Sequence, residues 1–151
     1  MRFQALVEFS RNRIVIAAAL AWLFAQTLKV ILGVIRERRF NFKWFVGTGG
    51  MPSSHAAGVT ALTSSIGLYL GFDTPFFAMA LLFTIVVLFD AQGVRRASGK
   101  QAEILNKVLD DIYWRKRIQE ERLMELLGHT PIEVLAGVAI GIFMSLLCYN
   151  P

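Results

Sequence analysis

The sequence has few charged residues and almost no cysteine. Only 18% of its 151 residues are charged and 55% are hydrophobic, whereas soluble domains average about 25% charged and about 45–50% apolar residues. The single cysteine, Cys148, cannot form a disulfide within the chain. The net charge of +5 suits an anionic partner, which can be nucleic acid, an acidic lipid or a phosphorylated substrate. The composition excludes a disordered or disulfide-bonded chain and favours one membrane domain over residues 1–151.

Four apolar segments predict membrane helices: Ile14–Ile35, His55–Phe72, Pro75–Phe89 and Val134–Tyr149. The first is long enough, at about 1.5 Å per residue, to cross a hydrocarbon core of roughly 30 Å. The other three are short for a full span, so we expect flanking polar residues or a locally thinner bilayer to accommodate them. The polar segment Gln92–Gly128 has helical periodicity and predicts an interfacial or capping amphipathic helix. We therefore expect an all-α bundle of about four transmembrane helices plus this helix.

Most of the lysines and arginines lie in two polar segments, Arg36–Ser54 and Gln92–Gly128. Four membrane spans would place both segments on one side of the membrane, and the positive-inside rule predicts that this side is cytoplasmic. A nucleic-acid partner is not expected, because acids are interleaved with the basic residues of Gln92–Gly128. Gly137 and Gly141 form a G-x-x-x-G pattern, which is typical of helix packing and, as the alternative, of a homodimer.

The two histidines of the chain each stand at the entry to an apolar segment. His55 follows the glycines and serines of Gly49–Ser54. The backbone N–H groups of a helix N-terminus attract an anion, and a histidine in the first turn can exchange a proton with it. An ordinary capped turn with an incidental histidine is the alternative.

The second histidine, His129, precedes Glu133 by four residues. At that spacing on a helix, the carboxylate would fix the imidazole tautomer and raise its basicity. Thr130 and Glu133 also fit a capping box with Pro131 at the first helical position, which would occupy Glu133 with backbone N–H groups. Both interpretations of Glu133 stay open at this point.

Several cations are candidate phosphate ligands. Lys29 lies within the first apolar segment, where a charge is costly unless it snorkels to the surface or faces a polar site. Arg36 lies two helical turns later on the same face. Arg95 and Arg96 offer bidentate contacts to phosphate oxygens, or else form a positively charged membrane flank. We expect Asp90 to pair with one of these cations, and the spacing of acids and histidines predicts no metal site.

These residues together resemble a known three-part signature. The chain is similar to the type 2 phosphatidic acid phosphatases and vanadium haloperoxidases, and in particular to the small, divergent membrane branch of that superfamily. The matching motifs are Lys29-x6-Arg36, Pro52-Ser53-Ser54-His55 and His129-x3-Glu133.

The resemblance implies a metal-independent hydrolase that needs no cofactor. His129 would be the nucleophile that becomes phosphohistidine, and Glu133 would orient it. His55 would protonate the leaving oxygen and later activate water. The phosphate would be held by two cations and by backbone amides, namely Lys29, Arg36 and the amides near Ser53 and Ser54.

The motifs also depart from the signature. Glu37 takes the place of a proline, Ser54 takes the place of a glycine, and the third motif ends in glutamate rather than aspartate. No Ser-Arg pair precedes His129 at the expected distance. Arg95 or Arg96 is then the candidate source of the missing guanidinium.

The sequence therefore predicts an integral membrane phosphatase that acts on a lipid phosphate or a polyprenyl (di)phosphate. Its expected partner is a membrane lipid with a phosphate head group. The departures leave a second hypothesis, a non-catalytic anionic-lipid-binding or scaffolding membrane protein that retains the phosphate pocket. A transporter or channel subunit would use Lys29 in a pore, but no symmetric pattern of polar residues supports one.

Overall fold

The structure is a computed structural model that describes residues 2–38, 50–92, 101, 103–106, 109 and 129–150. The described part of the chain is helical and contains no strand. Its long elements are α1 (Arg2–Arg11), α2 (Arg13–Glu37), α4 (Ser54–Leu70), α5 (Pro75–Gln92) and α7 (Pro131–Cys148). The predicted all-α class is confirmed.

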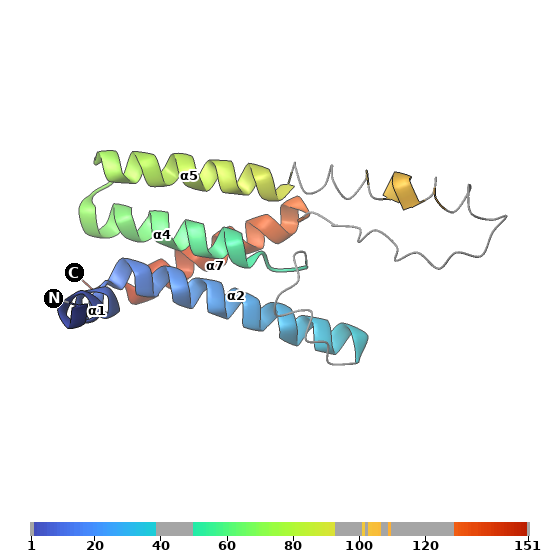
Figure 1. Cartoon of the computed structure of the whole chain (residues 1–151), viewed down its shortest axis with the longest axis horizontal. Coiled ribbons are helices and arrows are strands. Elements are labelled where there is room, and N and C mark those ends of the chain that lie inside the picture. The colour runs from blue at the N-terminus through green and yellow to red at the C-terminus, as the bar shows by residue number, and fades with distance from the viewer. Residues whose placement is uncertain are drawn as a thin grey trace.

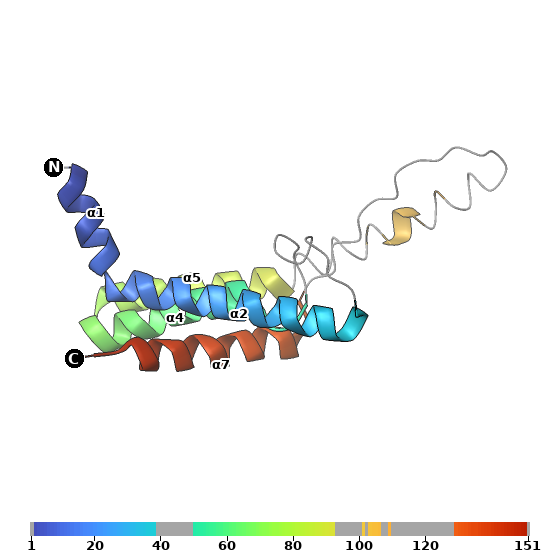
Figure 2. The same cartoon turned by 90° about the horizontal axis from the view of Figure 1, so that it is seen from below.

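Helices α2, α4, α5 and α7 lie side by side as a bundle, and α1 leaves the bundle at a steep angle (Figures 1 and 2). α4 packs against α2, α5 and α7. One end of the bundle holds Ser53, Ala91 and His129, and we call it the histidine end. The other holds Arg13 and Cys148 together with both chain termini (Figure 1), and we call it the terminus end.

Three helices, α2, α5 and α7, are long and apolar enough to cross a membrane, and the 17-residue α4 runs beside them. The four predicted apolar segments are all helical. α5 continues to Gln92 and α7 begins at Pro131, so each has 18 residues. The expected extension by flanking residues is thus correct for these two helices.

One helix of the structure was not predicted, and one predicted helix falls mostly outside the described residues. α1 was not among the predicted helices; Asn12 separates it from α2, and the Asn12 side chain caps α2 by accepting from Ile14 N at 3.1 Å and Val15 N at 3.3 Å. Most of Gln92–Gly128 lies outside the described residues, so the amphipathic helix there stays a prediction.

Small residues fill the inside of the bundle and large apolar residues cover its outside. One buried cluster consists of Ala21, Ala25, Ala57, Ala61 and Met144. The large exposed side chains include Phe76, Leu82 and Phe89 of α5 and Leu135 and Leu147 of α7. A soluble domain buries its large apolar residues, whereas membrane helices approach through small residues and present large ones to lipid. The packing therefore matches an integral membrane protein.

The two glycines of the G-x-x-x-G pattern face α4. A Cβ added at Gly137 would collide with the carbonyl oxygen of Ser53, and one added at Gly141 would lie 2.6 Å from the carbonyl oxygen of Ala57. Only glycine permits so close an approach of the two backbones. The pattern thus serves packing within one chain, and the homodimer stays a prediction.

Polar side chains join α4 to α5 inside the bundle. The hydroxyls of Thr63 and Thr84 lie 2.7 Å apart. Each hydroxyl has one proton, which it gives either to the other hydroxyl or to a carbonyl on the facing helix. The carbonyl of Ala80 lies 3.0 Å from the Thr63 hydroxyl, and that of Val59 lies 3.1 Å from the Thr84 hydroxyl. Hydroxyls in a membrane need such partners, because hydrocarbon offers none. These bonds fix the position of α4 along α5.

Candidate active site at the histidine end

The first turn of α7 is closed by a capping box. The Thr130 hydroxyl accepts a hydrogen bond from Glu133 N at 3.4 Å, and the Glu133 carboxylate accepts one from Thr130 N at 3.0 Å. Pro131 occupies the first turn, where its missing N–H costs nothing. The local sequence Thr-Pro-x-Glu therefore fixes the position of the Glu133 carboxylate.

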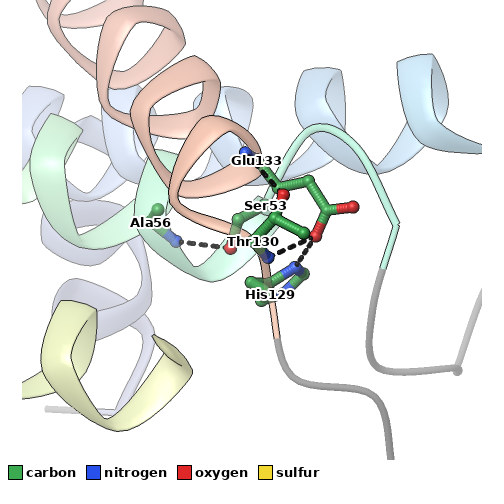
Figure 3. A network of polar contacts seen from close by, with 5 residues as sticks. All are labelled: Ser53, Ala56, His129, Thr130 and Glu133. Carbon is green, nitrogen blue, oxygen red and sulfur yellow. Dashed lines mark hydrogen bonds and ion pairs between the residues drawn. The ribbon is translucent and has the colours of Figure 1, made fainter. Parts of the chain in front are cut away.

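The same carboxylate oxygen also contacts His129. Glu133 Oε2 lies 3.1 Å from His129 Nδ1, and the His129 side chain is only 3% exposed (Figure 3). The two interpretations of Glu133 are thus both correct as geometry, since one oxygen caps the helix and contacts the imidazole. In the tautomer with its proton on Nδ1, the imidazole donates to Oε2 and its lone pair resides on Nε2.

Two backbone hydrogen bonds bring three helix ends together at this point. His129 N donates to the carbonyl of Ala91 in the last turn of α5 at 3.1 Å, and Ser53 N donates to the carbonyl of Glu133 at 3.0 Å. The start of α7 is therefore held between the end of α5 and the start of α4. Sequence analysis missed both bonds, because no local pattern shows which helices become neighbours.

The start of α4 supplies the second histidine. Ser53 is the N-cap, is fully buried, and its hydroxyl accepts from Ala56 N at 3.4 Å (Figure 3). Ser54 and His55 form the first turn; Ser54 is buried and His55 is exposed. Because the Ser53 N–H already bonds to Glu133, the predicted binding of phosphate by serine amides rests on Ser54.

Lys29 reaches the histidine end from the middle of the membrane helix α2. Its side chain is half-buried and packs on Gly50, where an added Cβ would lie 3.3 Å from Lys29 Cε. Gly50 has a φ of 86°, a backbone conformation that favours glycine. Lys29 also lies close enough to Glu133 for their opposite charges to attract. Lys29 therefore adds positive charge in the neighbourhood of the carboxylate that contacts His129.

The remaining predicted phosphate ligands lie around this centre or outside the described residues. Arg36 is exposed in the last turn of α2, a part of the helix that extends past the start of α4 (Figure 1). Asp90 is exposed in the last turn of α5, next to Ala91. Arg95 and Arg96 lie outside the described residues. The part of the chain that is described holds no group of three or more potential metal ligands.

Comparison with known proteins identifies the family. The Divergent PAP2 family matches residues 10–144, nearly the whole chain. The chain belongs to the Divergent PAP2 family. It is 37% identical over 152 residues to the "Uncharacterized membrane protein YuiD" of Bacillus subtilis (strain 168), with 93% of this chain and 96% of that protein covered. No solved structure matches the chain. The predicted membership of a divergent, membrane-bound branch of the phosphatase superfamily is confirmed, and the relative is likewise a membrane protein.

Proposed function

We propose that the chain is an integral membrane phosphatase that hydrolyses a lipid phosphate or polyprenyl (di)phosphate through a phosphohistidine. One observation carries the proposal: a buried imidazole, His129, is held through Nδ1 by a carboxylate that is itself fixed by a capping box. A structural cap needs Thr130 and Glu133 but no histidine in front of them. The histidine therefore calls for another role.

The reaction that fits this arrangement has two steps. Nε2 of His129 forms a bond to phosphorus while the bond from phosphorus to the ester oxygen breaks, and protonated His55 gives its proton to the leaving oxygen. His55, now neutral, then takes a proton from water, which attacks phosphorus as the nitrogen–phosphorus bond breaks and phosphate leaves. Glu133 stabilises the positive imidazole in the first step.

Charge stabilisation would come from cations at the same end of the bundle. Lys29 is half-buried beside Gly50 and lies within electrostatic reach of Glu133. An ammonium in such a site interacts more strongly with a phosphoryl group than it would in water. Arg36, Ser54, Arg95 and Arg96 complete the proposed phosphate site, with Asp90 as the partner of one of its cations. No step requires a metal.

The lipid phosphate as substrate is supported by the position of the site. His55, His129 and Lys29 belong to the histidine end of helices that cross a membrane. A substrate with an apolar tail would keep the tail beside the large exposed side chains of the bundle and present its phosphate to these residues. The proposal puts this end in the cytoplasm, because most lysines and arginines lie in Arg36–Ser54 and Gln92–Gly128, the segments that connect the helices at this end. An alkaline phosphatase fusion to the C-terminus, at the opposite end, should then be active, and an inactive fusion would reverse the orientation.

A second candidate function keeps the site and omits the chemistry. The absence of a Ser-Arg pair at the expected distance before His129 favours an anionic-lipid-binding or scaffolding membrane protein. Arg36 is exposed in the last turn of α2 and could equally bind a lipid head group that is not hydrolysed.

Phosphate release separates the two candidates. Purified full-length protein in detergent is incubated with a panel of lipid phosphates and polyprenyl diphosphates in the presence of EDTA. The proposal expects release that resists EDTA and falls by about 1000-fold or more in His129→Ala. His129→Ala protein that still folds and releases phosphate at the wild-type rate contradicts it. Lipid binding without release from any substrate supports the second candidate.

A further inference from the structure

At the terminus end, away from His129, two arginines line a cavity that has no role in the proposed function. A cavity of about 560 Å³ is lined by Arg11, Arg13, Ile16 and Cys148. Its volume falls in the range of small-molecule sites, roughly 300–1000 Å³. It lies where α1 meets α2 and where α7 ends.

The two arginines of this cavity are exposed and, among the described residues, have no side-chain partner. Neither Arg11 nor Arg13 makes an ion pair or a side-chain hydrogen bond within the described part of the chain. Glu8, which lines a neighbouring cavity together with Arg11, forms no ion pair with it there. Two arginines that line one cavity give it a positive potential, which would attract an anion.

Helix electrostatics add to this positive potential. Arg13 is the first residue of α2, and the first turn of that helix contains no acid. The N-terminus of a helix carries a partial positive charge, so a cation there is unfavourable unless an anion is bound. Arg13 therefore gains no electrostatic stabilisation from the dipole of α2. An external anion gives it a partner.

The terminus end also carries a marker of the membrane interface. Tyr69 and Tyr149 stack edge to face with ring centroids 5.1 Å apart, and the Tyr69 hydroxyl donates to the carbonyl of Cys148 at 3.0 Å. Tyrosines with an apolar ring and a bonded hydroxyl are typical of head-group depth. Cys148 thus places the cavity at that depth, and Ile16 gives it an apolar wall on the first membrane-crossing helix.

We propose that this cavity binds the phosphate of an anionic phospholipid from the surrounding bilayer, with Arg11 and Arg13 as its ligands and Ile16 beside the start of the acyl chains. The occupant is a bilayer lipid rather than free phosphate, because the walls combine cations with apolar groups at the depth where such lipids have their head groups. The site would anchor the junction of α1 and α2 at the membrane surface.

Cys148 provides a local readout, because it is the one cysteine of the chain and lines the cavity. The full chain is placed in nanodiscs of phosphatidylcholine, with or without phosphatidylglycerol, and the rate of maleimide labelling is measured. We expect phosphatidylglycerol to slow labelling of the wild type. Arg11→Gln and Arg13→Gln should each weaken this protection about fivefold, as expected for one cation near an anionic surface, and the double variant should lose it.

Matched variants distinguish binding of the lipid in this cavity from a general effect of positive charge on the protein. Arg38→Gln removes an exposed cation at the far end of α2 and should keep full protection, and Arg11→Lys/Arg13→Lys should keep most of it. Equal labelling of the wild type in both nanodiscs overturns the proposal. So does equal protection in the double glutamine variant, or an equal loss in Arg38→Gln. Protection by inorganic phosphate in phosphatidylcholine nanodiscs would contradict a lipid as the occupant.

Discussion

The two ends of the bundle use polar groups in opposite ways. At the histidine end, Glu133 contacts His129, caps α7 and attracts Lys29, so several polar groups share one carboxylate. At the terminus end, the Tyr69 hydroxyl joins α4 to the end of α7 through backbone atoms. The first arrangement orients side chains toward one another, and the second ties the chain together. Substitutions of the charged groups around His129 should therefore lower activity, whereas loss of the Tyr69 hydroxyl at the terminus end should lower stability alone.

Among variants that keep both histidines, the largest effect is expected when Glu133 loses its charge. Glutamine at the third position of a capping box still accepts from the N-cap N–H, so Glu133→Gln keeps the cap and removes the carboxylate from His129. We expect phosphate release to fall by at least about 100-fold, with a melting temperature close to that of the wild type.

Thr130→Ala is the matched control, since it removes the cap hydroxyl and leaves the carboxylate beside His129. It should destabilise the protein by about 1 kcal/mol and leave most of the activity. Equal activity in Glu133→Gln and the wild type would show that Glu133 serves the helix alone.

A smaller loss of activity is expected from Lys29→Met. The variant removes a cation that packs on Gly50 and is attracted by the charge of Glu133, while keeping the bulk of the side chain. Phosphate release should fall by about 100-fold, the lower end of the roughly 100- to 1000-fold range found when one charge-stabilising donor is lost. Arg36→Gln, exposed at the end of α2, should cost less. If Arg36→Gln loses more phosphate release than Lys29→Met, the phosphate binds nearer to the C-terminal end of α2 than proposed.

Helix packing is tested by Gly141→Ala. The new methyl group would lie 2.6 Å from the carbonyl oxygen of Ala57 and 2.8 Å from Thr60 Cβ, so α7 must move away from α4. We expect a loss of about 1–3 kcal/mol in the free energy of unfolding, measured by titration with a denaturing detergent.

Gly58→Ala is the same change on α4, where the nearest atom to the added methyl group is Trp22 Cβ at 3.6 Å. Its stability should equal or exceed that of the wild type, because alanine is the better helix former. If Gly141→Ala and Gly58→Ala lose the same stability, Gly141 is not needed for the close contact of α4 and α7.

The smallest effect is expected at the terminus end from Tyr69→Phe. The variant loses the hydrogen bonds to the Cys148 carbonyl and from Asn150 N but keeps the ring beside Tyr149. Stability should fall by about 1 kcal/mol and phosphate release should not change. A marked loss of release would show that the two ends are coupled.

Local patterns in the sequence were sufficient to predict the helices and one side-chain pair. The apolar runs predicted α2, α4, α5 and α7. The spacing of His129, Thr130 and Glu133 predicted the contact and the cap as alternatives, and the structure contains both. These features depend on residues within one helical turn or one membrane span, where geometry follows from spacing.

The contacts between helices could not be predicted in this way. The bonds from His129 to Ala91 and from Ser53 to Glu133, and the packing of Lys29 on Gly50, join segments far apart in the chain. They depend on which helices become neighbours, and no local pattern contains that information. α1 was missed for another reason: it is short, and its apolar residues are too few to mark it as a membrane helix.

The central claim is that His129 accepts the phosphoryl group, and trapping tests it most directly. The full chain is mixed with a lipid phosphate that it hydrolyses, quenched in alkali to preserve phosphohistidine, digested, and analysed by tandem mass spectrometry. The account predicts a phosphoryl group on His129 that Glu133→Gln reduces and His129→Ala abolishes. Turnover without a phosphoryl group on His129, or with one on His55 instead, would contradict it.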